Sequence, residues 1–110
     1  MPINTNTTFE DEEIRDTSEH TGSTVANGDF QMKTIIIENG LNQTVTCQCE
    51  GSMHSDFATS FEIGSSFDVT ASTNQPQTCS YYYPYFRVKA QCGTAPTTGD
   101  LTIHVIGVKD

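Results

Sequence analysis

Alternation of apolar and polar residues with a period of two dominates the sequence from residue 30 onward. In the run "YFRVKAQC", the apolar positions are Phe86, Val88, Ala90 and Cys92. The same period recurs in five further runs, at residues 30–38, 44–51, 56–64, 66–72 and 100–108. Because successive side chains of a strand point to opposite faces, each run predicts a strand with one buried face.

Short turn signals separate these runs. Gly, Asn, Ser or Pro interrupts the pattern at short intervals, and no segment shows a 3.6-residue apolar stripe of helical length. Parallel strands would need a crossover helix, so antiparallel pairing is expected. The sequence therefore predicts an all-β fold, a small antiparallel β-sandwich or jelly-roll-like domain at residues 29–110. Within the run 56–64, Phe57, Phe61 and Ile63 share one predicted face.

Residues 1–28 differ from the rest of the chain. They contain Phe9 and Ile14 but few other large apolar groups, and six acidic residues lie between positions 10 and 19. Such a segment alone cannot bury enough apolar area to offset its ordering entropy. We therefore expect an extended acidic N-terminal arm, ordered on a neighbouring molecule, with Phe9 and Ile14 as its anchors.

The charge balance excludes several classes of partner. The chain of 110 residues has a formal net charge of -9 and only five Lys and Arg residues, whereas phosphate binding needs clustered Lys or Arg. No run approaches the roughly 20 apolar residues of a membrane span. The start "MPINTNTTFEDEEIRD" lacks the basic and apolar blocks of a secretory signal. We expect synthesis in a cytoplasm, with neither nucleic acid nor membrane as a partner.

Four cysteines, Cys47, Cys49, Cys79 and Cys92, admit three interpretations. A zinc site usually uses Cys-x2-Cys spacing, but the near pair here is Cys-x-Cys within a predicted strand. A disulfide from Cys47 or Cys49 to Cys92 would fit if their strands face each other across the core. Buried free thiols that act as small apolar side chains are the third interpretation. All four are thus disulfide candidates, and we expect no metal.

Tyrosines crowd the start of one predicted strand in the stretch "YYYPY". Tyr81, Tyr82, Tyr83 and Tyr85 cannot all point inward, because neighbours on a strand face opposite ways. Pro84 cannot donate to a ladder, so it marks a strand start, an edge or a bulge. The rings either cover an open end of the sandwich, form a contact surface for a partner, or stack on a glycan.

The sequence contains no motif of catalysis. His20, His54 and His104 are far apart, and neither a G-x-S-x-G elbow nor a phosphate-cradling glycine loop is present. Carboxylates on the polar faces show no spacing that marks an acid and base pair. We expect no enzymatic activity, no catalytic residue and no cofactor.

Three stretches resemble small β-sandwich structural proteins encoded by tailed phages and related viruses. They are "TIIIENGLNQTVTCQCEGS", "FEIGSSFDVTAST" and "YYPYFRVKAQCGTAPTTGDLTIHV", and the likeness, in turns and alternation, covers residues 34–106. Head decoration or cement proteins and tail-associated modules are of this kind. The resemblance implies a structural role in which the chain contacts other subunits, and it transfers no catalytic residue.

These features together predict a virion structural protein that assembles in the host cytoplasm. The first hypothesis is a capsid decoration or cement protein that binds neighbouring copies of the major capsid protein, or another virion protein, as a homo-oligomer or symmetric array. The first alternative is a carbohydrate- or receptor-binding tail module in which the tyrosine cluster lines a groove. The second is a self-assembling extracellular filament subunit whose arm completes the sandwich of the next copy.

Overall fold

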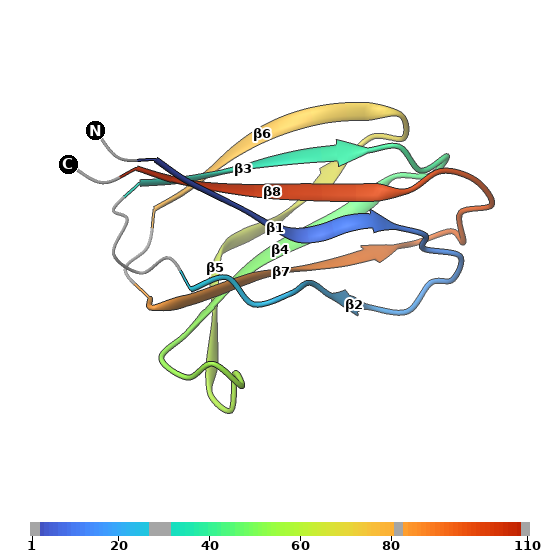
Figure 1. Ribbon diagram of the computed structural model, residues 1–110. Coiled ribbons are helices and arrows are strands. Elements are labelled where there is room, and N and C mark those ends of the chain that lie inside the picture. Colours follow the sequence, from blue (N-terminus) through green and yellow to red (C-terminus); the bar gives the residue numbers. More distant parts are fainter. Residues whose placement is uncertain (1–2, 27–31, 81–82, 109–110) are drawn as a thin grey trace.

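Two antiparallel four-stranded sheets face each other and enclose one core (Figure 1). The computed structural model describes residues 3–26, 32–80 and 83–108. The strands are β1 (Ile3–Glu12), β2 (His20–Thr21), β3 (Met32–Asn39), β4 (Val45–Ser52), β5 (Ser60–Val69), β6 (Thr73–Ser80), β7 (Tyr85–Cys92) and β8 (Leu101–Val108). Within the described ranges, no helix is long and apolar enough to cross a membrane.

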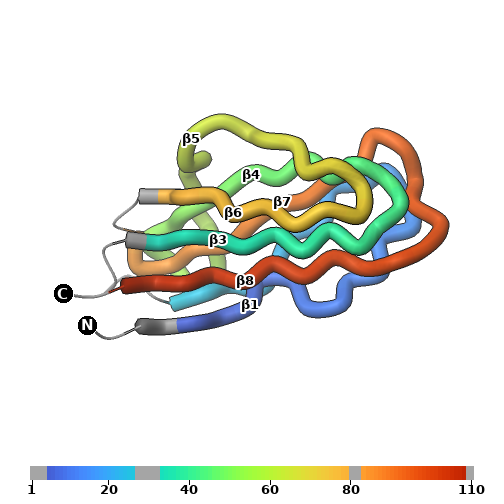
Figure 2. Tube along the Cα trace, turned by 90° about the horizontal axis from the view of Figure 1, so that it is seen from above, coloured from blue at the N-terminus to red at the C-terminus, as the bar shows by residue number. Residues whose placement is uncertain are grey.

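The strand order is that of a long hairpin rolled up on itself. β4 pairs with β5, β3 with β6, β2 with β7 and β1 with β8, all antiparallel. Two further pairings, β3 with β8 and β4 with β7, join these ribbons into the sheets β1-β8-β3-β6 and β2-β7-β4-β5. Figure 2 shows the first sheet with its strands in that order. This is a jelly-roll arrangement, so the predicted all-β sandwich is confirmed.

The inward faces follow the predicted alternation. On β7, burial alternates along the whole strand, with Phe86, Val88, Ala90 and Cys92 at 1% exposure or less. β8 alternates in the same way, which places Leu101, Ile103 and Val105 inward. A charged side chain shares the inward row of β3, because Lys33 is buried on the same side as Ile35 and Ile37. Burial disfavours its ammonium form and lowers the pKa of Lys33.

The strands β5 and β6 differ from the sequence prediction. The runs at 56–64 and 66–72 merge into the single strand β5, whose register against β4 shifts between Cys47 and Cys49. Gly64, with φ of +70°, lies in the extra residues that this shift leaves unpaired. The sequence analysis did not predict β6, because this strand contains Pro76. Proline is tolerated there because β6 is an edge strand of its sheet.

The N-terminal segment is part of the sandwich rather than a separate arm. β1 pairs with β8, and Phe9 and Ile14 lie in the core, with Ile14 at 0% exposure. Thr8 and Ser23 connect the segments on either side of β2, since Ser23 N donates to Thr8 O at 2.6 Å and Thr8 Oγ1 donates to Ser23 O at 2.9 Å. The predicted arm at residues 1–28 is therefore wrong for its described part, residues 3–26.

The physical reason lies in the partner strands. The entropy argument treated the segment as an isolated peptide, but the edges of β7 and β8 offer it backbone donors and acceptors. Gly22 N donates to Val88 O at 2.8 Å, and Val25 N donates to Phe86 O at 2.7 Å. With the backbone paired, a few apolar side chains suffice to hold the segment in place.

Substitution of Ile14 by Ala should therefore destabilise the whole domain. We expect the free energy of unfolding to fall by about 3 kcal/mol, because a fully buried side chain is truncated and leaves a cavity. Urea denaturation followed by circular dichroism measures this change. The exposed neighbour Glu13 supplies the control, since Glu13→Ala should change the stability by no more than about 0.5 kcal/mol. If the two variants had equal free energies of unfolding, the result would instead support a separate N-terminal arm.

Candidate interaction surface

The loop between β4 and β5 projects away from the body of the sandwich (Figure 1). Its base is tied by Ser52, whose Oγ donates to Thr59 O at 2.6 Å and accepts from the backbone N of His54 at 3.0 Å. Within the loop, Phe57 has a positive φ of 54° and donates its backbone N–H to His54 O at 3.1 Å. The hydrogen bonds give this hairpin a defined conformation.

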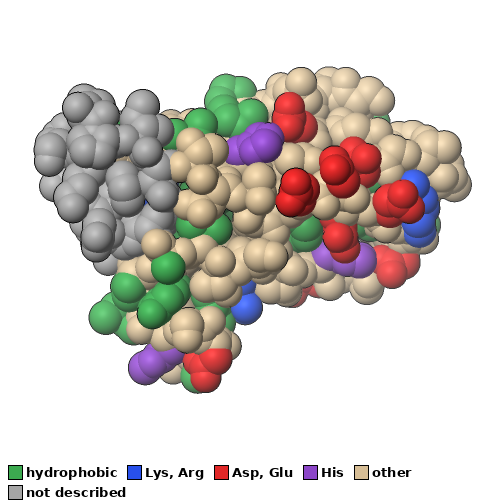
Figure 3. Space-filling view, in the orientation of Figure 1, with side chains coloured by type: hydrophobic (Ala, Val, Ile, Leu, Met, Phe, Trp, Pro, Cys, Tyr) green, Lys and Arg blue, Asp and Glu red, His purple; other side chains and the backbone are tan. Residues whose placement is uncertain are grey.

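Apolar side chains gather on this hairpin. Among the described residues, Met53 and Phe61 are the large apolar side chains that are exposed, at 61% and 47%. Phe61 stacks on Tyr83 with ring centroids 5.6 Å apart and an interplanar angle of 19°. We name Met53, Phe61 and Tyr83 the hairpin patch. Figure 3 shows apolar side chains at the lower left, over the β4–β5 hairpin, whereas most of the acidic side chains on that face lie over the body of the sandwich.

The ring of Tyr83 rests on Gly51 of β4. A Cβ added at Gly51 would lie 2.6 Å from Tyr83 Cδ2, so a larger residue would displace the ring. Gly51 pairs with Phe61 on β5, which places Phe61 on the same side of the sheet as the core. The sequence pattern therefore placed Phe61 in the correct row. Phe61 is nevertheless exposed, because the inward face of a strand is shielded from water only where other residues pack on it.

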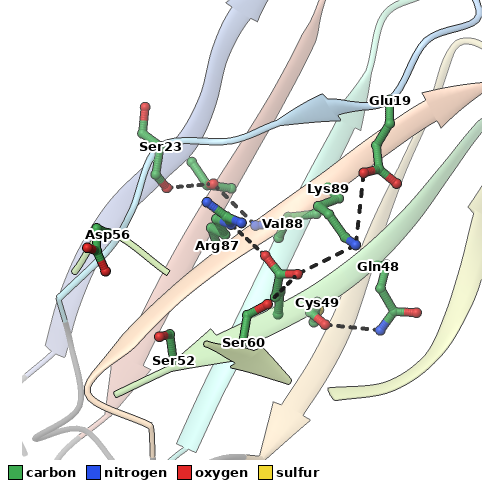
Figure 4. Close-up of polar contacts among 12 residues, drawn as sticks. Glu19, Ser23, Gln48, Cys49, Ser52, Asp56, Ser60, Arg87, Val88 and Lys89 are labelled. Carbon is green, nitrogen blue, oxygen red and sulfur yellow. Dashed lines mark hydrogen bonds and ion pairs between the residues drawn. The ribbon is translucent and has the colours of Figure 1, made fainter. Parts of the chain in front are cut away.

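A charged network covers the outer face of the same sheet, β2-β7-β4-β5, beside the hairpin (Figure 4). Its centre is Glu50 on β4, whose side chain is only 6% exposed. Glu50 accepts from Arg87 Nε at 2.5 Å and from Ser60 Oγ at 3.3 Å, and Lys89 Nζ lies 3.5 Å from its second oxygen. Lys89 also lies 4.0 Å from Glu19.

This network connects the sheet to the hairpin. The guanidinium carbon of Arg87 lies 3.9 Å from the centroid of the Phe57 ring, so Arg87 contacts both Glu50 and the loop. Ser60, the first residue of β5, also binds Glu50. A carboxylate that is buried but fully paired is stable, whereas an unpaired one is not. The network therefore ties the hairpin, through Phe57 and Ser60, to the outer face of the sheet.

An open groove of about 470 Å³ lies beside the network on the same outer face. It is lined mainly by polar residues, among them Glu19, Gln48, Glu62, Lys89 and Gln91. In the described part of the chain, no three His, Cys, Asp or Glu side chains gather in a way that would hold a metal ion. The groove offers hydrogen-bonding groups but no aromatic platform.

The predicted partner-contact residues have separate outcomes. Tyr83 lies in the hairpin patch and Tyr85 is half-buried at the start of β7, immediately after Pro84 as expected for a strand start. Tyr81 and Tyr82 lie outside the described residues. Phe9 and Ile14 are core residues, so their prediction as contacts for a partner is wrong.

Met53 was missed by the sequence prediction. A single methionine gives no periodic signal, so only its position in the "GSMHSDF" loop between two strands indicated exposure.

The four disulfide candidates are not arranged for the expected bond from Cys47 or Cys49 to Cys92. All four cysteines are buried and free. Cys47 and Cys92 lie on β4 and β7, which are neighbours in one sheet and do not face each other across the core. Cys49 and Cys79 come from different sheets, and their sulfur atoms are 2.8 Å apart.

Substitution of Glu50 by Gln tests the network. The change removes the negative charge that Arg87 and Lys89 face, so we expect a loss of about 2 kcal/mol in the free energy of unfolding. The matched control is Glu62→Gln, because Glu62 pairs with Glu50 across β4 and β5 but is exposed. It should change the stability by less than about 0.5 kcal/mol. Equal effects in urea denaturation would contradict the assigned role.

Comparison with known proteins identifies the fold but no family. The chain matches no protein-family model and no curated protein sequence. Its structure is similar to PBSX exported protein XepA, with a TM-score of 0.74 and 9% identity over 97% of this chain. It is also similar to a chain of infectious bursal disease virus, Gx strain, with a TM-score of 0.55 and 8% identity over 96% of this chain.

A third similar structure is that of Bacillus endospore appendages, described as disulfide-linked pili, with a TM-score of 0.59 and 12% identity over 98% of this chain and 89% of that one. The present chain spans only 37% of XepA and 31% of the viral chain. At such low identities these likenesses show the shared β-sandwich fold and nothing more. The similar structures include a phage-derived exported protein, a viral particle protein and a pilus protein.

Proposed function

We propose that this chain is a structural module of a virion or a comparable extracellular assembly, and that it works by contact and not by catalysis. The finer proposal is a capsid decoration or cement role, in which the major capsid protein or another virion protein is the partner and the copies form a symmetric array. The observation that supports a contact role is the hairpin patch, which presents exposed Met53 and Phe61 on a projecting hairpin.

The composition of the hairpin patch suits a protein interface. Aromatic residues and Met are enriched in the buried centres of interfaces, because they supply large contact area. The stack of Phe61 on Tyr83 and the hydrogen bonds of Ser52 fix the patch before binding. Less conformational entropy is then lost on association, so a small apolar surface contributes more to affinity.

Adhesion must come from the folded body of the module. Phe9 and Ile14 are buried in their own domain, which removes them as anchors on an adjacent subunit. A filament built by donation of the N-terminal strand has no support either, because β1 already pairs with β8 of the same chain. The net charge of -9 further favours a partner surface that is neutral or basic around an apolar pocket.

The proposal is tested with particles released by the source cells. Mass spectrometry of gradient-purified particles should find this chain as a stoichiometric component. Purified protein should also rebind particles made without it, and the double variant Met53→Ser with Phe61→Ser should bind at least about 10-fold more weakly. The variant should keep the wild-type circular dichroism spectrum, because both side chains are exposed.

The matched control is Ile36→Ser, which removes a half-exposed apolar side chain from β3, on the β1-β8-β3-β6 sheet. It should bind particles like the wild type. Absence of the chain from the particles would overturn the virion role. Unchanged rebinding by the double variant would overturn the role of the hairpin patch.

A further inference from the structure

Two thiols from opposite sheets meet at one side of the core. Cys49 lies on β4 and Cys79 on β6, and their Sγ atoms are 2.8 Å apart. A disulfide bond requires about 2.05 Å between sulfur atoms, so an approach of less than about 1 Å would bring the pair to bonding distance. Within the described part of the chain, this is the one pair of cysteines joined by a sulfur–sulfur hydrogen bond.

We propose that Cys49 and Cys79 form a disulfide that joins the two sheets, with a low-molecular-weight disulfide such as oxidised glutathione as the oxidant. This inference does not depend on the proposed function. It rests on the distance between the two sulfur atoms, on the sheets that they connect and on the cavity beside them.

The cavity gives an oxidant a place to react. It has a volume of about 250 Å³ and is lined by Cys49 and Cys79 together with residues of β5 and β6, including Phe67 and Gln77. β5 and β6 are the edge strands of their sheets on this side. Cys79 is 6% exposed and Cys49 is 1% exposed, so Cys79 is the more accessible thiol.

The reaction proceeds in two thiol–disulfide exchanges. The hydrogen bond between the sulfur atoms lowers the pKa of Cys79 and raises the pKa of Cys49, so Cys79 ionises first. The Cys79 thiolate attacks one sulfur of the oxidant, forming a mixed disulfide and releasing one small thiol. Cys49 then loses its proton and attacks Cys79 Sγ, which releases the second small thiol. Two electrons and two protons thus pass from the cysteine pair to the oxidant.

The other two cysteines are the natural comparison within the same chain. Burial, followed by the nearby Cys92 and Asp68, raises the pKa of Cys47 to about 12, so its reactive thiolate is scarce at neutral pH. Burial also raises the pKa of Cys92. Because β4 and β7 are adjacent in one sheet, a bond between Cys47 and Cys92 would not connect the two sheets.

Peptide mapping of the wild-type protein tests the proposal directly. Protein purified with reductant is desalted, incubated with oxidised glutathione near pH 8, and alkylated under denaturing conditions. We expect the intact mass to fall by two hydrogen atoms before alkylation, and digestion to yield a linked pair of peptides that contain Cys49 and Cys79. Cys47 and Cys92 should carry the alkyl label. Four labelled cysteines, or any other pairing, would overturn the proposal.

Thermal unfolding supplies a second readout. The bond would close a loop across 30 residues, so the oxidised protein should melt roughly 10 °C above the reduced protein. The double variant Cys49→Ala with Cys79→Ala should show no difference between oxidised and reduced samples. The matched control, Cys47→Ala with Cys92→Ala, should keep the difference. The reverse pattern would refute the assignment, and peptide mapping still decides if a variant does not fold.

Discussion

Burial of two half-apolar sheets against each other is the constraint on which this structure depends. Each sheet has one apolar face, and neither face is shielded from water unless the other sheet is present. The rolled-hairpin order adds to this dependence, because each strand pair from β4–β5 outward joins residues that are further apart in sequence. The core therefore forms cooperatively, and residues from both ends of the chain, such as Phe9 and Val105, belong to it.

The two open sides of the sandwich are closed by different chemistry. On the side of β1 and β2, Thr8 and Ser23 exchange hydrogen bonds, and backbone bonds extend this contact to β7. On the side of β5 and β6, the edge strands contact each other, and a cavity lies next to Cys49 and Cys79. On the first side, hydrogen bonds join the two sheets. On the second side, the sulfur atoms of Cys49 and Cys79 lie where a disulfide bond would join the two sheets covalently.

The outer surface follows from the same geometry. At the hairpin end of β5, no packing shields the inward-facing Phe61 fully, so this ring is exposed and stacks on Tyr83. The charged network around Glu50 supports the hairpin from the opposite face of the sheet. An apolar surface that projects from an otherwise largely acidic molecule favours binding to another protein. The contact role proposed for this chain thus depends on where the sheets end, not on a sequence motif.

The sequence by itself determined the strands with regular alternation, the inward rows of β4, β7 and β8, and the all-β class, because a period of two with short turns permits few other folds. It could not determine that β1 belongs to the sandwich or that Pro76 lies in an edge strand, since both depend on which neighbour offers its backbone. The exposure of Phe61 and the meeting of Cys49 with Cys79 were likewise decided only by the tertiary structure. Local pattern fixes the direction of a side chain, but only the packing of distant strands decides what that side chain meets.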